Sequence, residues 1–222
     1  MKYVTCHEVR LPAVLLAVLT AVCLAAAPAS ATPLYEQTPN AGFSDSYEDP
    51  LLGANYYADA FNFGGGLDRI VTSVEWWGIE TALDPLSYNI RFFESVANQP
   101  GAVIASFSGT PVQPSTNAEF GLNIADLRLS GNADYFISIS ADTDLLAQES
   151  FQWSHGGANG SGGSWLWIEP LPGLGSWTND GTPENFAFRL NGHVVPEPAT
   201  ILLLGAGMGG LAWRRLRGRV RA

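Results

Sequence analysis

Tryptophan is the residue type in this sequence that most clearly suggests a binding site, because it is abundant and several tryptophans lie beside loops. The chain has 7 tryptophans, and Trp165, Trp167 and Trp177 stand next to Gly- and Pro-rich segments, where ligand contacts tend to lie. An indole can stack on the apolar face of a sugar ring while neighbouring acids and amides bind the hydroxyl rim. We therefore take these three residues as candidates for glycan stacking. Core packing is the alternative for each, since aromatic side chains also fill β-sandwich cores.

Carboxylates are numerous and could bind a cation. Asp142 and Asp144, together with the acids between Asp45 and Asp49, have the oxygen character that Ca²⁺ prefers. Their spacing matches no EF-hand loop, and aspartate is also a common turn former. We expect no cofactor and assign no metal, with Ca²⁺ at Asp142 and Asp144 as the cation site to consider.

The sequence favours a protein without catalytic activity. His155 and His193 are the histidines that follow the N-terminal segment, and no G-x-S-x-G, H-E-x-x-H or P-loop motif is present. Glycoside hydrolysis needs two carboxyl groups at a set separation, and the many acids specify no such pair. We predict no catalytic residue. A secreted hydrolase remains the alternative, since a Ser-His-Asp site could assemble from distant residues.

The segment between the two ends of the chain is strongly acidic. The formal net charge of the whole chain is −10, although most of its bases lie near the ends. The central segment has no lysine, and its arginines are Arg69, Arg91, Arg128 and Arg189. Such a surface repels phosphate backbones and anionic headgroups. This charge argues against nucleic acids and lipid surfaces as partners of the domain.

Residues 1–31 have the form of a secretory signal peptide. A basic start and an apolar core precede Ala29 and Ala31, which form an A-x-A cleavage site. We therefore expect the Sec translocon as a partner during export. Both cysteines, Cys6 and Cys23, lie in the part that would be removed. The mature protein is then expected to contain no thiol and no disulfide.

The C-terminal segment has three parts in a fixed order: the linker 194–198, the apolar run 199–213 and the basic tail 214–222. In the linker, Pro196, Glu197 and Pro198 should stay extended, because proline fixes φ and disfavours helix in the preceding residue. The apolar run would span ~22 Å as a transmembrane helix, which is short for a hydrocarbon core of about 30 Å. The tail arginines, which place this end in the cytoplasm, are Arg214, Arg215, Arg217, Arg219 and Arg221.

Small residues line one face of the predicted transmembrane helix. Gly205 and Gly209 form a G-x-x-x-G pattern, which allows a second helix to approach closely. We expect this face to dock on the processing enzyme or on a second copy of itself. The alternative is that small residues only make the anchor weak and easy to extract.

The tripartite C-terminal segment resembles the PEP-CTERM sorting signal of Gram-negative, exopolysaccharide-producing bacteria. That signal is read by exosortase, a membrane cysteine transpeptidase. The resemblance implies export across the inner membrane, transient anchoring in it, and removal of roughly the last 25 residues. The processed protein would then reach the cell surface or the extracellular medium.

The segment between the termini has the pattern of an all-β domain. Apolar and polar residues alternate in short runs, such as Tyr88 to Phe93, and turn residues separate the runs. Trp76 and Trp77 must point to opposite faces of their strand. We predict an antiparallel β-sandwich of jelly-roll type at residues 53–193, after an irregular lead-in at residues 32–52.

Several pieces of the central segment resemble a β-sandwich domain that is common among PEP-CTERM proteins: Val74–Gly78, Ile90–Phe93, Leu129–Ile139 and Phe186–Gly192. The family usually has Asp-Asp-Phe where this chain has Asp59-Ala60-Phe61. A cation site formed by the paired acids would therefore be weakened here. The resemblance implies the fold and the export route, and it implies no activity.

These observations together predict an exported, exosortase-processed protein of the cell surface or biofilm matrix. We expect its domain to associate with carbohydrate or exopolysaccharide without acting as an enzyme. The alternatives are the secreted hydrolase and a purely structural matrix protein that has no small ligand.

Overall fold

The structure, a computed structural model, describes residues 32–49, 53–81, 86–112, 119–143, 150–157, 164–169, 175–179 and 185–196, together with 205, 207 and 208. The chain divides into two units, Met1–Ser30 and Ala31–Ala222, and every described residue belongs to the second. The predicted signal peptide, including Ala29 and Ala31, and the arginine tail lie outside the described residues. Residues 205, 207 and 208 are helical. None of the described helix is long and apolar enough to cross a membrane.

One β-sheet holds the first and last strands of the domain. Its strands run in the order β1 (Thr32–Gln37), β14 (Phe188–Val194), β5 (Arg69–Glu80), β10 (Phe151–Gly156) and β13 (Asn185–Phe186). Two further strands lie off this path: β2 (Pro39–Asp45) pairs with β10, and β8 (Glu119–Leu129) pairs with β5. We call this the first sheet.

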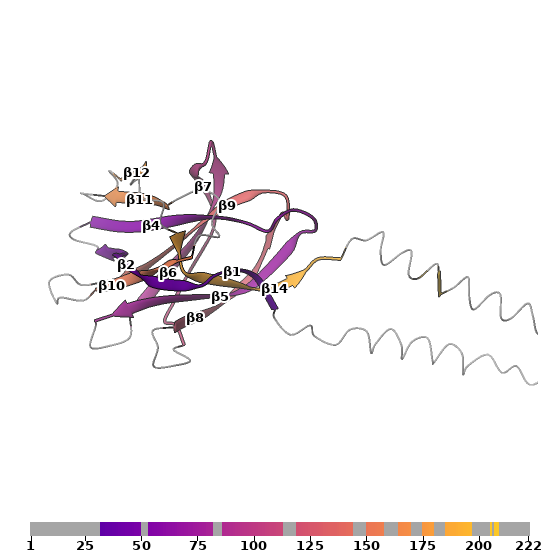
Figure 1. Ribbon diagram of the computed structural model, residues 1–222, viewed down its shortest axis with the longest axis horizontal. Coiled ribbons are helices and arrows are strands. Elements are labelled where there is room, and N and C mark those ends of the chain that lie inside the picture. The colour runs from indigo at the N-terminus through magenta and orange to yellow at the C-terminus, as the bar shows by residue number, and fades with distance from the viewer. Residues whose placement is uncertain are drawn as a thin grey trace, which may run out of the picture. The chain divides into compact units, whose positions relative to one another are not determined.

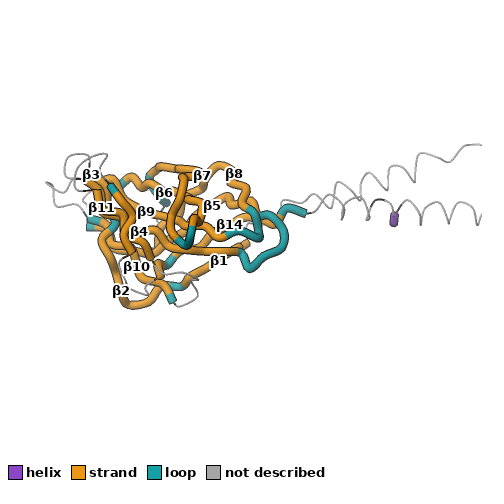
Figure 2. Tube along the Cα trace, turned by 90° about the horizontal axis from the view of Figure 1, so that it is seen from above, coloured by secondary structure: helices purple, strands orange, loops and turns teal. Residues whose placement is uncertain are grey.

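The other β-sheet, here called the second sheet, is also 7-stranded. Its order is β12 (Ser176–Asn179), β11 (Ser164–Glu169), β4 (Gly53–Asn62), β3 (Tyr47–Asp49), β9 (Asp134–Asp142), β6 (Ser87–Val96) and β7 (Gln99–Gly109). Its pairings are antiparallel except between β3 and β9. Figure 1 shows β4 and β11 in one layer and β1, β5, β8 and β14 in another, and strands make up most of the described residues in Figure 2. The predicted all-β sandwich is confirmed.

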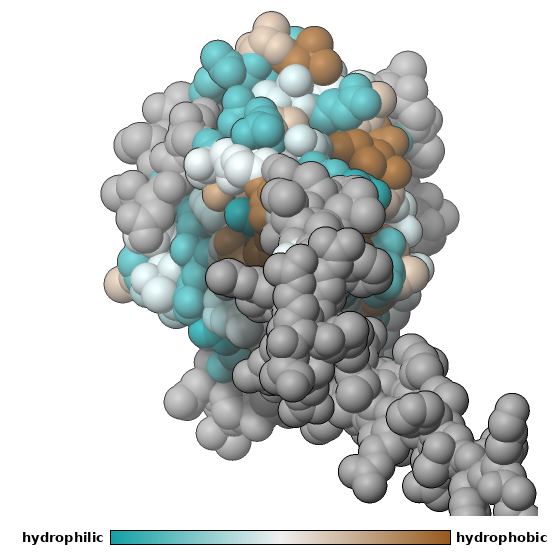
Figure 3. Space-filling view, turned by 90° about the vertical axis from the view of Figure 1, so that its right-hand side faces the viewer, coloured by the Kyte–Doolittle hydropathy of each residue, from teal (hydrophilic) through white to brown (hydrophobic). Residues whose placement is uncertain are grey.

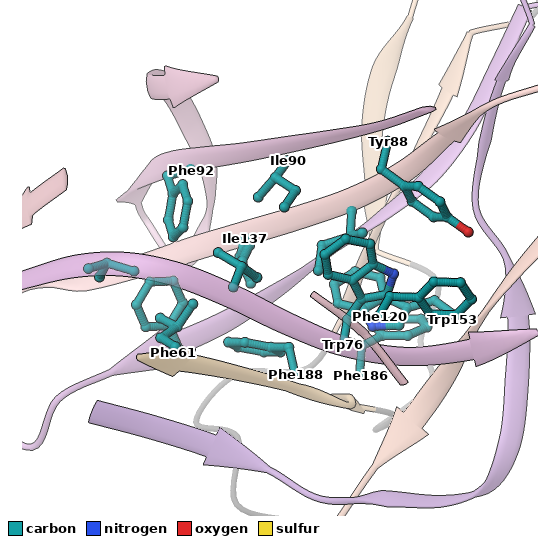
Figure 4. Close-up of a cluster of buried hydrophobic side chains, with 14 of the residues drawn as sticks. Phe61, Trp76, Tyr88, Ile90, Phe92, Phe120, Ile137, Trp153, Phe186 and Phe188 are labelled. Carbon is teal, nitrogen blue, oxygen red and sulfur yellow. The ribbon is translucent and has the colours of Figure 1, made fainter. Parts of the chain in front are cut away.

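Aromatic side chains fill the space between the two sheets, as Figure 4 shows. Trp76 stacks on Phe120 with ring centroids 5.7 Å apart, and Trp153 stacks on Phe186 at 4.6 Å. The indole Nε1 of Trp153 donates a hydrogen bond of 2.9 Å to the carbonyl of Ala187. Trp76 is 0% exposed, whereas Trp77 is half-buried beneath the Arg189 guanidinium on the opposite face. The predicted division of Trp76 and Trp77 between core and surface is confirmed.

The irregular lead-in predicted at residues 32–52 is wrong for the part of it that the structure describes. Residues 32–49 form β1, β2 and β3, so the sandwich begins before residue 53. The Pro, Asn, Asp and Ser content of this segment suggested a loop. A strand at the side of a sheet tolerates such residues, because one row of its backbone groups needs no partner strand. The backbone groups on the other side of β1 are paired with the antiparallel strand β14.

The hairpin between β6 and β7 turns slightly earlier than the sequence predicts. The sequence indicates a turn at Asn98–Gly101, but β7 already begins at Gln99. Ala97 and Asn98 form the loop with φ of 51° and 62°. Two successive left-handed residues fit a type I′ hairpin, whose twist matches that of the flanking strands.

The domain surface alternates between hydrophilic and apolar areas. Figure 3 shows hydrophilic residues separating brown apolar areas on the side from which it is drawn. Exposed apolar residues include Val103 and Ile104 on β7, which ends the strand order of the second sheet.

Candidate functional site

Three of the aromatic residues come together on the outer face of the second sheet. Trp167 of β11 pairs across the strands with Trp177 of β12 on one side. On the other side it pairs with Tyr56 of β4. Successive residues of a strand point to opposite faces, and Tyr57, the neighbour of Tyr56, packs against the core between the sheets. Tyr56, Trp167 and Trp177 therefore lie on the face that points away from that core. Together with Phe93 of β6, we call them the outer aromatic cluster.

The rings of this cluster contact one another at varied angles. Tyr56 stacks on Trp167 with centroids 6.1 Å apart and planes 18° apart. Trp167 and Trp177 meet at 5.2 Å and 67°, and Phe93 meets Trp177 edge-on at 5.4 Å and 90°. The two indoles thus form a corner rather than a flat row. Both are half-buried, so each contributes to packing and keeps part of its surface open to a ligand.

Trp167 and Trp165 are each held by specific contacts. The Nε1 of Trp167 donates to the Glu169 carboxylate at 3.2 Å. A Cβ on Gly175 would lie 2.2 Å from the Trp167 ring, so only glycine fits against that ring. Trp165 packs on a small buried cluster that includes Ala58, and its Nε1 is buried without a hydrogen-bond partner. Of the three predicted tryptophans, Trp167 and Trp177 contact each other. Trp165, two residues before Trp167 on β11, lies on the same face and packs on the same buried cluster as Trp177.

Polar side chains continue the same face beyond Tyr56. The Arg91 guanidinium lies 5.2 Å from the Tyr56 ring centroid and donates two hydrogen bonds to the Glu48 carboxylate, one of them 2.7 Å long. Ser140 Oγ also donates to Glu48. Burial raises the pKa of Tyr56 to about 12, so its phenol stays protonated at neutral pH. The face therefore offers an aromatic corner followed by hydroxyl, guanidinium and carboxylate groups.

The predicted calcium ligand Asp142 lies at the end of β9 and accepts a 2.6 Å hydrogen bond from Asn89 Nδ2. Burial and the nearby Glu48 carboxylate raise the pKa of Asp142. Asp144 lies outside the described residues. Among the residues that the structure does describe, no three His, Cys, Asp or Glu side chains gather as a metal site would require.

A serine and a histidine that the sequence did not connect come into contact through β2 and β10. Ser44 Oγ lies 2.8 Å from His155 Nε2, which is the separation between a nucleophile and its general base. His155 is 9% exposed and meets Phe186 edge-on. Nothing in the sequence singles out Ser44, because its contact depends on the pairing of β2 with β10. His193, the other predicted histidine, is exposed on β14.

The sorting segment begins directly after the last strand. The Val195 N–H donates a 2.9 Å hydrogen bond to the Asp68 carbonyl, which joins the residue after β14 to the residue before β5. The next residue, Pro196, is exposed. Glu197, Pro198 and Gly209 lie outside the described residues, while Gly205 lies in the helical part.

The family model described as the PEP-CTERM protein-sorting motif matches residues 194–217. No curated protein matches the chain. The chain therefore carries a PEP-CTERM sorting motif, which indicates export and exosortase-mediated sorting toward the cell surface. The match covers the C-terminal segment and reaches no residue of the sandwich before Val194, the last residue of β14.

Proposed function

We propose that the sandwich binds a neutral glycan of the extracellular matrix on the outer face of its second sheet, without catalysing a reaction. The observation that carries this proposal is the corner formed by Trp167 and Trp177. Each indole offers an apolar face to a sugar ring. Because the two indoles are not coplanar, they suit a bent or terminal part of a glycan chain better than the flat surface of a crystalline polysaccharide. Partial exposure of both indoles leaves room for such stacking.

The polar half of the face supports the same ligand class. The partly exposed Arg91 guanidinium and Glu48 carboxylate can donate to and accept from sugar hydroxyls, while the buried Tyr56 ring supports Trp167 from the side of β4. The lysine-free, acidic domain disfavours a polyanionic polysaccharide. Stacking on part-buried indoles should be weak for a single site, with a Kd between millimolar and micromolar, about −4 to −8 kcal/mol.

The export route completes the proposal. We infer that the Sec translocon carries the chain across the inner membrane of a Gram-negative cell, where the segment 199–213 holds it until exosortase acts. Release would place the domain among exopolysaccharides at the cell surface or in the biofilm matrix. There, many weak contacts to a repeating polymer suffice for retention, because multivalency multiplies the avidity.

We expect Trp177→Ala to weaken binding of the protein to a neutral exopolysaccharide by about tenfold or more, which corresponds to about 1.4 kcal/mol. The free energy of unfolding should fall by less than the roughly 3–5 kcal/mol typical of a core tryptophan, because Trp177 is half-buried. Glycan microarrays and isothermal titration calorimetry measure the first effect, and urea unfolding measures the second.

Trp77→Ala is the matched control for this experiment. Trp77 is also a half-buried tryptophan, but it lies on the first sheet beneath Arg189. Its replacement should leave glycan binding unchanged. Equal losses of affinity in both variants would contradict a site on the second sheet, and no glycan bound by the parent protein would leave a purely structural matrix role.

The contact between Ser44 and His155 makes a secreted hydrolase the second candidate function. A nucleophilic serine reacts with fluorophosphonates, and Ser44→Ala would abolish that labelling. Because Ser44 lies within strand β2 rather than on an exposed elbow, we expect no labelling that depends on Ser44. Labelling of the parent protein that the variant lacks would favour the hydrolase over the binding module.

A further inference from the structure

Three side-chain oxygens are buried in the sandwich without a hydrogen-bond partner: Gln37 Oε1, Asp59 Oδ1 and Asn185 Oδ1. The residues that carry them are 0%, 0% and 5% exposed. A buried polar atom without a partner costs free energy, and a buried carboxylate costs more than a neutral amide. Asp59 makes no ion pair among the described residues, so nothing in that part of the chain balances its charge.

The backbone brings the three residues close together. The Phe186 N–H donates a 2.8 Å hydrogen bond to Asp59 Oδ2, which puts the neighbouring Asn185 beside Asp59. Gln37 lies close enough to Asp59 for its side chain to lower the pKa of that carboxyl. Gln37 Nε2 donates to the Tyr35 hydroxyl, so its Oε1 is the end of the amide left without a partner.

Gly156 completes the surroundings of these oxygens. It is directly opposite Asn185 in the pairing of β10 with β13. A Cβ placed on Gly156 would lie 3.1 Å from Gln37 Oε1 and 2.9 Å from the Phe186 carbonyl oxygen. Gly156 therefore lets Gln37 Oε1 and the Phe186 carbonyl oxygen approach β10 more closely than a side chain at this position would allow.

We propose that Gln37, Asp59 and Asn185 bind Ca²⁺ between the two sheets. Their donor set consists of oxygens alone, which suits a hard cation and not Zn²⁺, whose sites use thiolate and imidazole. Ca²⁺ takes six to eight oxygens, so water and backbone carbonyls would supply the rest. A proton on Asp59 is the competing solution, but one proton can satisfy at most two of the three oxygens.

The position of this site gives the cation a structural role. Gln37 ends β1 and Asn185 begins β13, both in the first sheet, whereas Asp59 lies on β4 of the second. Bound Ca²⁺ would link the two sheets near the outer strands β1 and β13. With one carboxylate among the three ligands, we expect the weak affinity of extracellular modules, with a Kd on the order of 10⁻⁴–10⁻³ M. The cation would then stabilise the domain only after export.

The test uses the processed protein and measures its Tm in EDTA, in CaCl₂ and in MgCl₂ at matched ionic strength. Ca²⁺ at about tenfold its Kd should raise the Tm by roughly 3–6 °C. Tb³⁺, bound in place of Ca²⁺, should luminesce on tryptophan excitation, because Trp153 stacks on Phe186 beside Asn185. Excess Ca²⁺ should remove that luminescence.

Two variants decide whether the effect belongs to this site. Asp59→Asn keeps the side-chain shape and should abolish both the Tm rise and the Tb³⁺ signal. Gln37→Glu adds a second carboxylate and should tighten Ca²⁺ binding by about tenfold or more, since affinity follows the ligand charge. Asp142→Asn, which changes the acid at the end of β9, should leave both signals intact.

The alternatives give different results. If Asp59 is only protonated, Ca²⁺ changes neither the Tm of the parent nor that of Gln37→Glu, and the proposal fails. If Ca²⁺ stabilises Asp59→Asn as much as the parent, the cation binds elsewhere and this site is wrong. A calcium response of the parent that is lost in Asp59→Asn and strengthened in Gln37→Glu supports the site.

Discussion

Replacing Pro196, Glu197 and Pro198 by alanine should leave the protein at full length in the membrane of a cell that contains exosortase. The parent protein should lose roughly its last 25 residues. The prolines should keep the linker extended just after β14, in the form that a membrane protease binds. Alanine would let this segment join the apolar helix, because alanine is the best helix former. Intact mass spectrometry of membrane and medium fractions measures the effect.

The control for this substitution replaces Glu169 and Pro170, the other Glu-Pro pair in the sequence. That variant should be processed like the parent protein. The same truncated mass in the triple-alanine variant and in the parent would show that the enzyme does not read the Pro-Glu-Pro linker.

The second large effect is on the pH dependence of stability. Burial raises the pKa of Asp59 from 3.8 to about 8, although the Phe186 N–H, the nearby Ala60 N–H and the nearby Gln37 side chain oppose the rise. The folded state therefore keeps a proton that the unfolded state loses above about pH 4. The stabilisation by this proton is complete below pH 4 and is lost as pH rises toward 8.

In EDTA, the free energy of unfolding should therefore fall as the pH is raised from 5 to 8. Each pKa unit corresponds to about 1.4 kcal/mol, so the full rise from 3.8 to about 8 corresponds to on the order of 5 kcal/mol. Urea unfolding at several pH values measures this slope. Asp59→Asn should remove it, because its amide does not titrate, whereas Asp68→Asn, at a partly exposed acid, should keep it. An equal slope in the parent and in Asp59→Asn would contradict a buried, protonated Asp59.

The strands that cross the core could be predicted because their sequences alternate. Tyr88, Ile90 and Phe92 are all 0% exposed, and the residues between them are half-buried. The same period of two residues places Trp76 in the core and Trp77 on the opposite face of β5. Residues 32–49 could not be predicted in this way, since their strands are short or lie at the side of the first sheet, and they depend on distant partners such as β14, β10 and β9.

The candidate sites were less predictable than the fold. Trp167 and Trp177 were identified from their loop-adjacent positions, but Tyr56 joins them only through the pairing of β4 with β11. Gln37 and Asn185 carry no local signal at all, because an amide becomes a metal ligand only where the fold buries its oxygen. Strand order decides which residues meet, and a single sequence with a period of two does not specify strand order.

Binding of a neutral glycan to the outer aromatic cluster is the central claim, and the indole N–H resonances of the processed protein test it most directly. Addition of the neutral exopolysaccharide fragment should shift the signals of Trp167 and Trp177, assigned by single substitutions. The signals of Trp76 and Trp153, which are 0% exposed, should not move. Shifts confined to Trp77, or no shift of any indole at millimolar glycan, would contradict a glycan site on the second sheet.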